Sequence, residues 1–441
     1  MEAPVASPIP ADARRSLLIY NLLFPFAFVA MLPSLLTRMI RRGNYQSKFG
    51  QRLGNYSAED RERFAKGEWI WVHSISVGET ILALKLVKAI HALEPRSNIV
   101  LSVTTSTGFG EAQPHVSDWL EVIYNPLDAP GIVERALQLV RPRRLIFIEA
   151  VWPNLLSATK SRGIPVTFLP RLSPRSESRF RRFRQLTGPI FRLVDWLAAG
   201  EPEDIARWKS LGVPEERVRV TGNPKFDGGG ANPERAAKFR NFLSECGVPD
   251  NAPILLAGST FDGEERILAE VYRELRGEFP DLFLILVPRH VERTDSILKE
   301  LQPLNLRVAR RTQKPQASAE VLIVDTTGEL RDWYLLATVV FIGKSLTATG
   351  GQNPVEPVLA GKPVMFGPHM ENFSPIVPKW LAANAAVQIT DAGELRERAG
   401  GLLRDEALRT DLAKRARKIA EPHQGATARA IRVLMESSES L

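Results

Sequence analysis

The sequence predicts an α/β protein made of two doubly wound domains, and three observations support that fold class. Short apolar runs, often β-branched and bounded by Gly, Pro, Ser or Asn, alternate along the chain with amphipathic helical patterns. Strands that alternate with helices form parallel sheets whose two faces are covered. The runs fall into two series on either side of the glycine-rich stretch DGGGANP, residues 227–233. With 441 residues, the chain is also too long for one ordinary domain.

Each series contains enough strands for a sheet of its own. The first comprises residues 69–74, 99–104, 145–148, 165–169, 196–199 and 217–221, and the second comprises 254–257, 282–287, 321–324, 339–342, 363–366 and 386–389. Helices are expected between the strands, as at 79–93, where Leu82, Leu86 and Ile90 recur on one face, and at the C-terminal stretch 405–436. We therefore expect an N-terminal domain at 43–226 and a C-terminal domain at 227–441, after a separate segment at 1–42.

The N-terminal segment contains an uncharged run, LLIYNLLFPFAFVAMLPSLL, at residues 17–36. Its length is about that needed to cross a hydrocarbon core, so we expect a hydrophobic membrane-anchor helix. The larger cluster of basic residues follows the run, which places the rest of the chain in the cytoplasm by the positive-inside rule. A buried helix of the first domain is the alternative. A cleaved signal peptide is a further alternative, although no clear cleavage site is present.

The charge balance favours acidic partners. The net charge is +8, with a pI near 9.6, which suits phosphorylated ligands, an anionic membrane surface or nucleic acid. The densest basic run, RLSPRSESRFRRFR at 171–184, is either a solvated face or a contact for anionic headgroups and phosphates. No recognised nucleic-acid-binding motif accompanies this basic run. The single cysteine, Cys246, excludes an internal disulfide and a cysteine metal cluster.

One acidic residue stands where the first strand gives way to a helix. In the stretch HSISVGE, Ser76 and Gly78 belong to a tight turn and Glu79 begins the helix. An acid at this point commonly caps free amides and complements the helix dipole. Alternatively, Glu79 is a general base at the carboxyl end of the sheet, where doubly wound folds bind their ligands. Spacing alone does not separate the two interpretations.

The second domain contains candidate anion-binding groups after its strands. Arg289 and His290 follow one strand, where Arg289 either grips a phosphate or pairs with Glu292. Hydroxyls and glycines before helix starts can present amides to an anion, and Glu356 could accept hydrogen bonds from a ribose diol. The further candidates are Thr327, Gly328, Glu329, Gly350, Gly351 and Asn353. The sequence contains neither a GxxxxGK[ST] loop nor a GxGxxG fingerprint, so kinase-like and NAD-dependent functions lack support.

Nine short motifs occur in an order that identifies a family resemblance. They are SKFGQRLGNY, HSISVGE, RLSPRS, TGNPKFD, STFDGEE, LVPRHVER, DTTGEL, GGQNPVEP and FGPHMENF. Each motif alone is weak, but all nine in one order at compatible spacing form a specific signal. The chain resembles the 3-deoxy-D-manno-octulosonic acid (Kdo) transferases of lipopolysaccharide synthesis, over roughly residues 17–435.

The resemblance implies an inverting glycosyltransferase of the GT-B type, with two Rossmann-like domains facing across a cleft. Such an enzyme moves Kdo from CMP-Kdo to a lipid A precursor (lipid IVA) at the cytoplasmic face of the inner membrane. It needs no metal ion and no cofactor besides its donor substrate, and it has no nucleic-acid partner. The N-terminal domain receives the lipid acceptor, and the C-terminal domain holds CMP.

The resemblance also assigns roles to residues of this chain. It implies that Glu79 is the general base and that Lys225 and Arg289 act in catalysis near the departing phosphate. The donor-binding set implied is Arg289, His290, Thr327, Gly328, Glu329, Gly350, Gly351, Asn353 and Glu356. The acceptor-binding set is Ser76, Gly78, Thr104, Thr105, Glu149, Arg171 and Ser173.

The chain departs from the family pattern at a few positions. Glu149 is the only acid where the family usually has Glu-Thr-Glu before Trp-Pro-Asn, and Lys344 stands where the family usually has glycine. Pro224 and Gln352 replace a usual leucine and a frequent histidine. Two alternatives therefore stay open: a GT-B transferase with another acceptor or nucleotide sugar, and an inactive membrane-anchored binding protein on the same fold.

Overall fold

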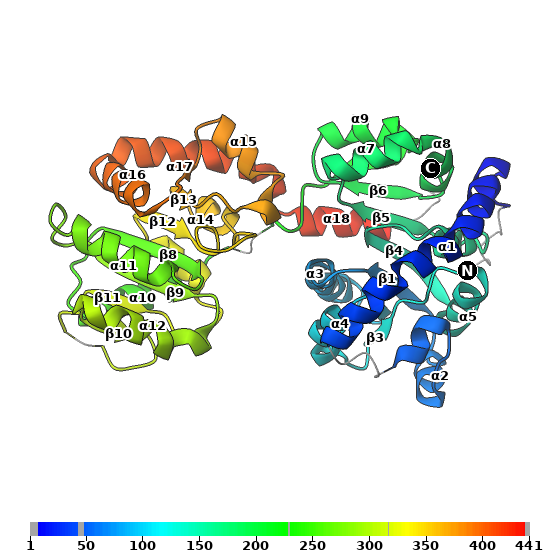
Figure 1. Cartoon of the computed structure of the whole chain (residues 1–441), viewed down its shortest axis with the longest axis horizontal. Helices are drawn as coiled ribbons and strands as arrows, with labels where there is room; N and C mark the ends of the chain where they lie inside the picture. Colours follow the sequence, from blue (N-terminus) through cyan, green and yellow to red (C-terminus); the bar gives the residue numbers. More distant parts are fainter. Residues whose placement is uncertain (1–7, 43–47, 228–229, 316, 437–441) are drawn as a thin grey trace. The chain divides into compact units, whose positions relative to one another are not determined.

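The computed structural model describes residues 8–42, 48–227, 230–315 and 317–436 (Figure 1). The chain divides into two compact units. The first consists of residues 1–227 together with 425–441, and the second consists of residues 228–424.

The first unit is built on a seven-stranded parallel sheet with the strand order β3-β2-β1-β4-β5-β6-β7. The strands are β1 (Trp69–Ser74), β2 (Asn98–Val103), β3 (Leu120–Tyr124), β4 (Pro142–Glu149), β5 (Val166–Pro170), β6 (Trp196–Ala199) and β7 (Val218–Val220). The order reverses between β1 and β4. Doubly wound sheets bind ligands at such a switch point, outside the carboxyl ends of the strands.

Helices cover both faces of this sheet. Helices α3 (Val77–Leu93), α4 (Ser106–Ala112) and α18 (Ala426–Met435) cover one face, and α5 (Pro130–Val140), α6 (Pro153–Lys160), α8 (Arg184–Phe191) and α9 (Glu203–Ser210) cover the other. Trp69 and Trp71 of β1 pack into the core on the face that α5 covers, and Ile70 and Val72 pack into the core on the face that α3 covers. Side chains of a strand alternate between faces, so a strand buried on both sides is apolar throughout, which is why β1 was recognisable in the sequence.

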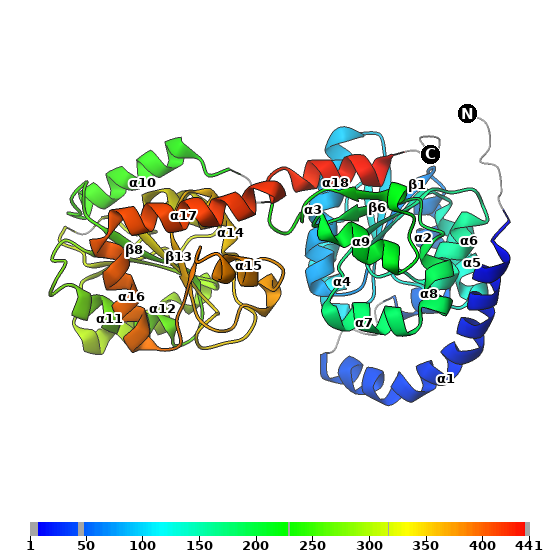
Figure 2. The same ribbon diagram turned by 90° about the horizontal axis from the view of Figure 1, so that it is seen from above.

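The N-terminal helix α1 (Ala11–Arg42) curves along the outside of the first unit (Figure 2). Pro25 and Pro33 lie inside this helix, and proline removes a backbone hydrogen bond and bends a helix. The helix packs on α8, and Asn21 and Asn154 of α6 exchange side-chain hydrogen bonds of 3.1 and 2.7 Å. Over the described part of the chain, no helix is both long and apolar enough to cross a membrane. The predicted anchor is therefore not confirmed.

The second unit repeats the architecture with another seven-stranded parallel sheet, in the order β10-β11-β9-β8-β12-β13-β14. Its strands are β8 (Ile254–Thr260), β9 (Phe283–Pro288), β10 (Val308–Arg310), β11 (Val321–Ile323), β12 (Val339–Ile342), β13 (Val364–Phe366) and β14 (Val387–Gln388). Helices α11 (Glu264–Leu275), α12 (Thr294–Leu301) and α16 (Ala392–Arg404) pack on one face. The strand order reverses between β8 and β12, which is the switch point of this sheet.

Two of the strands, β3 and β10, were not predicted from the sequence. The sequence of β3, LEVIY, includes Glu121, whose carboxylate is nearly buried and accepts a 2.6 Å hydrogen bond from Arg63 of α2 (Ala58–Phe64). That charge interrupts the apolar run, and its distant partner is invisible in the local sequence. Strand β10 has three residues and lies at the edge of the sheet, where little apolar surface needs covering.

The C-terminal stretch also differs from the prediction of one helix in the second domain. It forms α17 (Glu406–Ala420), a short 3₁₀ turn and then α18, with Gly425 in the left-handed region at φ 70° before α18. Helix α18 belongs to the first unit, where Arg144 donates hydrogen bonds of 3.1 and 2.9 Å to the carbonyls of Leu434 and Glu436. The chain thus returns to its first sheet after completing the second.

Candidate functional site

The switch point of the first sheet holds Glu79. Ser76 caps the N-terminus of α3, and its hydroxyl donates a 2.9 Å hydrogen bond to Glu79 Oε1. The amide of Ile75 donates a 2.7 Å hydrogen bond to Glu79 Oε2. The residue is 8% exposed. Glu79 therefore does cap its own helix, and it is at the same time a nearly buried carboxylate at the ligand-binding end of the sheet.

The surroundings of Glu79 raise the pKa of its carboxyl group. Burial is the main cause, because it disfavours the charged form. The bonds from Ile75 and Ser76 act in the opposite direction, and the charge of Glu149 adds to the rise. A general base needs a pKa near the working pH, so a raised pKa suits a carboxylate that takes a proton.

Glu149 ends β4 on the other side of the switch point. Its backbone lies in the left-handed region at φ 61°, an uncommon conformation for a residue with a side chain that tends to occur at functional sites. Lys225, which follows β7, donates a hydrogen bond to Glu149 Oε1 and forms an ion pair with it. Glu79, Glu149 and Lys225 thus gather from the ends of β1, β4 and β7 into one polar site.

The other predicted acceptor-side residues have structural partners of their own. Thr105 caps α4 by accepting a 3.1 Å hydrogen bond from the amide of Gly108. Ser173 caps α7 (Pro174–Arg182) by accepting from the amide of Ser176. Nothing lies within 4 Å of a Cβ built at Gly78, so the space beside the start of α3 is open. Arg171 is exposed after β5.

Asn125 is a site residue that the sequence reasoning missed. Its side-chain amide donates 2.6 Å hydrogen bonds to the carbonyl of Ser74 and to the hydroxyl of Thr104, and so ties together the loops after β1 and β2. It follows β3, the strand that went unrecognised. His73, beside Ser74, was missed as well; burial lowers its pKa to about 3, so the ring is neutral. It packs edge-on against Trp152.

The switch point of the second sheet is organised by another acid, Glu264. Its carboxylate accepts hydrogen bonds from the amides of Lys344, Ser345 and Leu346, at 2.8, 3.0 and 3.0 Å. The amide of Phe261 adds a fourth, at 2.9 Å. Lys344 lies in the left-handed region at φ 56°, a conformation that glycine adopts without strain. Glu264 is fully buried, and burial raises its pKa.

Arg289 and His290 are exposed after β9. The Nδ1 of His290 lies 3.6 Å from Glu292 Oε1, so Glu292 approaches the histidine rather than Arg289. Within the described residues, the Arg289 guanidinium has no ion-pair partner. The surface-pair alternative for Arg289 is therefore wrong, and this arginine stays available to an anion.

The predicted amide site at Gly350 and Gly351 is occupied from within the chain. The amide of Gly350 donates to Glu371 Oε2 at 2.7 Å, and the amide of Gly351 donates to the carbonyl of Lys344 at 3.0 Å. A Cβ at Gly351 would lie 2.4 Å from the sulfur of Met370, so glycine is required there for close packing. Both amides are thus bonded within the chain, and that they hold a phosphate stays a prediction.

Of the remaining donor-side residues, some are bonded within the chain and others are exposed. Glu329 accepts from the hydroxyl of Thr326 at 2.7 Å and from the indole of Trp333, which anchors the start of α13 (Leu330–Trp333). Thr327 and Gly328 are exposed beside it. Asn353 accepts from the amide of Val355, at the start of α14 (Val355–Leu359). Glu356 in α14 accepts a 3.2 Å hydrogen bond from Arg331 and is about one-fifth exposed, at 19% of its side chain.

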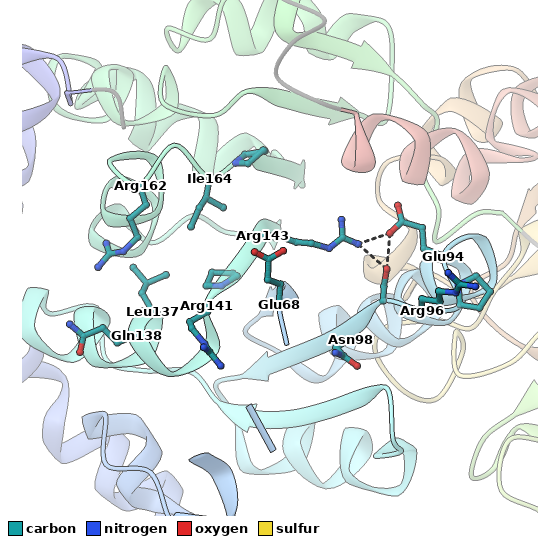
Figure 3. A pocket seen from close by; sticks show the side chains of 14 residues that line it. Glu68, Glu94, Arg96, Asn98, Leu137, Gln138, Arg141, Arg143, Arg162 and Ile164 are labelled. Carbon is teal, nitrogen blue, oxygen red and sulfur yellow. Dashed lines mark hydrogen bonds and ion pairs between the residues drawn. The ribbon is translucent and has the colours of Figure 1, made fainter. Parts of the chain in front are cut away.

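A large basic groove of about 1430 Å³ lies at the opposite, amino end of the first sheet. Arg143 reaches Glu94 at 2.5 Å and Ser97 at 2.8 Å within it (Figure 3). Arg162 is paired with Glu134. Because ligands of doubly wound sheets bind at the carboxyl ends, and because these arginines are already paired, this groove is not the candidate site.

Two doubly wound parallel sheets, each with polar side chains at its carboxyl edge, define the class: a GT-B-like fold. The crystal structure of Anabaena Alr3699/HepE in complex with UDP has the same fold, with a TM-score of 0.50, 15% identity and coverage of 85% of this chain and 100% of that chain. At that identity the likeness concerns the fold alone.

The sequence comparisons are more specific. Residues 47–228 match the family model for 3-deoxy-D-manno-octulosonic-acid transferase (kdotransferase). The 3-deoxy-D-manno-octulosonic acid transferase of Bordetella pertussis is 34% identical over 378 residues, which cover 83% of this chain and 86% of that protein. The C-terminal CMP-Kdo binding domain of WaaA from Acinetobacter baumannii is 31% identical, covers 42% of this chain and 96% of that chain, and has a TM-score of 0.39. The protein belongs to the Kdo transferase family of glycosyltransferases.

Proposed function

We propose that this protein is an inverting glycosyltransferase that moves Kdo from CMP-Kdo to a hydroxyl group of a lipid A precursor, lipid IVA. The observation that carries the proposal is Glu79, a nearly buried carboxylate with a raised pKa at the switch point of a Kdo transferase family chain. CMP-Kdo and the lipid precursor are then its small-molecule partners. No metal ion, cofactor or nucleic acid takes part in the proposed reaction.

The acceptor chemistry follows from the first unit. Glu79 takes the proton from the acceptor hydroxyl as that oxygen attacks the anomeric carbon of Kdo, and the bond from that carbon to CMP breaks. A single displacement of this kind inverts the anomeric carbon. Lys225 is paired with Glu149, whose charge acts on Glu79, and in our proposal its ammonium group offsets negative charge in the transition state.

The donor chemistry follows from the second unit. The A. baumannii domain that this chain resembles is described as a CMP-Kdo binding domain, and its likeness covers 42% of the chain. In our proposal the free guanidinium of Arg289 contacts the phosphate of CMP, because a guanidinium can bind two phosphate oxygens at once. Asn353 and Glu356 lie near the start of α14, and Glu356 would accept hydrogen bonds from the ribose.

We also propose that the protein works at the cytoplasmic face of the inner membrane, where α1 lies on the bilayer surface. One face of α1 exposes large apolar side chains at helical spacing: Leu18 (71%), Leu22 (66%), Phe26 (73%) and Val29 (65%). Phe26→Asp combined with Val29→Asp should abolish co-sedimentation of the full chain with anionic vesicles. Co-sedimentation at the wild-type level in that variant would contradict the placement.

The function is tested by a transfer assay with the purified full-length protein, CMP-Kdo and tetraacylated lipid A precursor. We expect release of CMP together with a Kdo-modified lipid, and an inverted anomeric configuration by NMR. Release of CMP without a modified lipid would support the donor and reject the acceptor. Consumption of a UDP-sugar in place of CMP-Kdo would reject the donor.

A further inference from the structure

An apolar pocket of about 600 Å³ adjoins the candidate site in the first unit. One wall is the inner side of α1, from Ser16 to Ala27, and the opposite wall is formed by α7 and α8. The floor is aromatic, with Phe168, Phe191 and Trp208. The volume lies within the usual range for small-ligand pockets, and the lining is of the apolar kind that such pockets have.

The pocket opens onto charged groups at its rim. Glu149, the partner of Lys225 at the switch point, is one of its lining residues, so the pocket and the candidate site share a residue. Arg171 and Arg179 also line it. In the part of the chain that the structure describes, neither guanidinium has an ion-pair partner, and Arg179 only lies over the ring of Phe180, at 5.7 Å. The rim therefore offers uncompensated positive charge.

Specific polar contacts hold α1 in place as the wall of this pocket. Besides the amide pair of Asn21 and Asn154, Tyr20 hydrogen-bonds to the buried carboxylate of Asp128. Asp128 in turn accepts from the amides of Asn154 and Leu155, at 3.1 and 2.9 Å, at the start of α6. Buried polar groups joined in this way fix one arrangement of the helix, so the gap beside it is built into the fold.

We propose that this pocket binds one acyl chain of the acceptor, while Arg171 and Arg179 contact an acceptor phosphate. The apolar body suits a hydrocarbon chain, and the two free cations at the rim suit an anionic headgroup. Because Glu149 belongs to both sites, a chain seated in the pocket would bring the attached sugar to the catalytic carboxylates. This inference rests on the proposed acceptor, an acylated and phosphorylated disaccharide.

The matched variants are Leu23→Trp and Leu22→Trp, at adjacent positions of α1. Both side chains are largely exposed, at 56% for Leu23 and 66% for Leu22, but only Leu23 lines the pocket. Binding of tetraacylated lipid A precursor and of its deacylated form is measured by equilibrium titration in detergent solution, with full-length protein and no donor. Leu186→Trp, from the opposite wall in α8, serves as a second variant if Leu23→Trp fails to fold.

We expect Leu23→Trp to lower the affinity for the acylated acceptor about tenfold or more, because displacing two methylene groups from an apolar site has that effect. The affinity for the deacylated form should stay unchanged, and Leu22→Trp should bind both as the wild type does. Equal effects of the two variants, or no effect of either pocket variant, would overturn the proposal. Equal competition by a phospholipid of matched chain length would overturn it too, in favour of a bulk-lipid site. If the wild type binds the acylated acceptor in this pattern but transfers no Kdo, the pocket stands and the proposed function fails.

Discussion

Glu79 and Glu264 occupy corresponding places in the two sheets. Each stands in the first turn of the helix that follows the first strand of its unit, α3 after β1 and α11 after β8. Burial raises the pKa of both carboxyl groups. Their hydrogen bonds differ: Glu79 is held within its own loop by one amide and one hydroxyl, whereas Glu264 accepts from four amides, three of them in the loop after β12.

In our proposal, this difference separates a reactive acid, Glu79, from a structural one, Glu264. Four amide donors saturate the carboxylate of Glu264, which leaves little capacity for a substrate proton. Glu79 keeps unused acceptor capacity and has a second carboxylate, Glu149, nearby. In our proposal, the same local pattern, an acid where a strand gives way to a helix, serves chemistry in one unit and loop positioning in the other. The number of hydrogen-bond donors to each carboxylate distinguishes the two roles.

The largest effect should come from Glu79→Gln. This change keeps the shape of the side chain and removes its ability to take a proton, so the transfer rate should fall by roughly two to four orders of magnitude. The free energy of unfolding should change by about 1 kcal/mol, the usual contribution of a helix cap. Initial rates and urea unfolding of the same preparation measure both quantities. A transfer rate within tenfold of the wild type would remove Glu79 from the role of base.

Glu264→Gln should have the opposite profile. The amide group that replaces one carboxylate oxygen is a donor, and it would face amides that need an acceptor. An unsatisfied buried donor costs about 1–3 kcal/mol, so we expect that loss in the free energy of unfolding of the second unit. Nucleotide binding should weaken because the loop from Lys344 to Leu346 loses its fixed position, while acceptor binding stays at the wild-type level.

Calorimetric unfolding and titrations with CMP and with the acceptor follow these changes. Wild-type stability together with a transfer rate as low as that of Glu79→Gln would show that the two acids are equivalent after all.

Much of this comparison could not be predicted from the sequence, for identifiable physical reasons. Apolar strands buried on both faces, such as β1 and β9, are recognisable because burial is a local demand on composition. Strand β3 was not recognisable, because its charged residue Glu121 is neutralised by Arg63, which lies 58 residues away in the sequence. The return of α18 to the first unit depends on Arg144, some 290 residues from its partner Leu434.

The candidate site was predictable in its residue types but not in its bonds. Topology places Glu79 and Glu149 at one switch point, and a correct strand order would have brought them together. The left-handed backbone of Glu149 and its pairing with Lys225 are set by three separate strands and leave no local trace. The hydrogen bond from the amide of Gly350 to Glu371 was not predictable either, because a glycine near a helix start fits an anion site equally well.

Glu149→Gln should change the pH dependence of transfer, and so test the proposed difference between Glu79 and Glu264. The base acts only when it is ionised, and the charge of Glu149 disfavours the ionised form of Glu79. Removing that charge lowers the pKa of Glu79, so the acid limb of the rate profile should move to lower pH. The released ammonium group of Lys225 would favour the ionised base and act in the same direction. Profiles of kcat measured for both proteins over the acid range give the answer, and a limb displaced to higher pH would contradict the assignment.

Ser76→Ala should move the same limb in the other direction and give the smallest effect. The hydroxyl of Ser76 donates to the ionised carboxylate of Glu79, a bond that lowers the pKa. Its loss raises the pKa of Glu79 further, so the acid limb should shift to higher pH, and the lost helix cap should cost about 1 kcal/mol of stability. Ser57→Ala is the matched control, because Ser57 caps α2 through the amide of Asp60 and makes no contact with Glu79. The control should lose comparable stability and keep the wild-type profile. If both serine variants left the limb in place, the hydroxyl would act only as a cap, and Glu79 would resemble Glu264 more closely than their hydrogen bonds indicate.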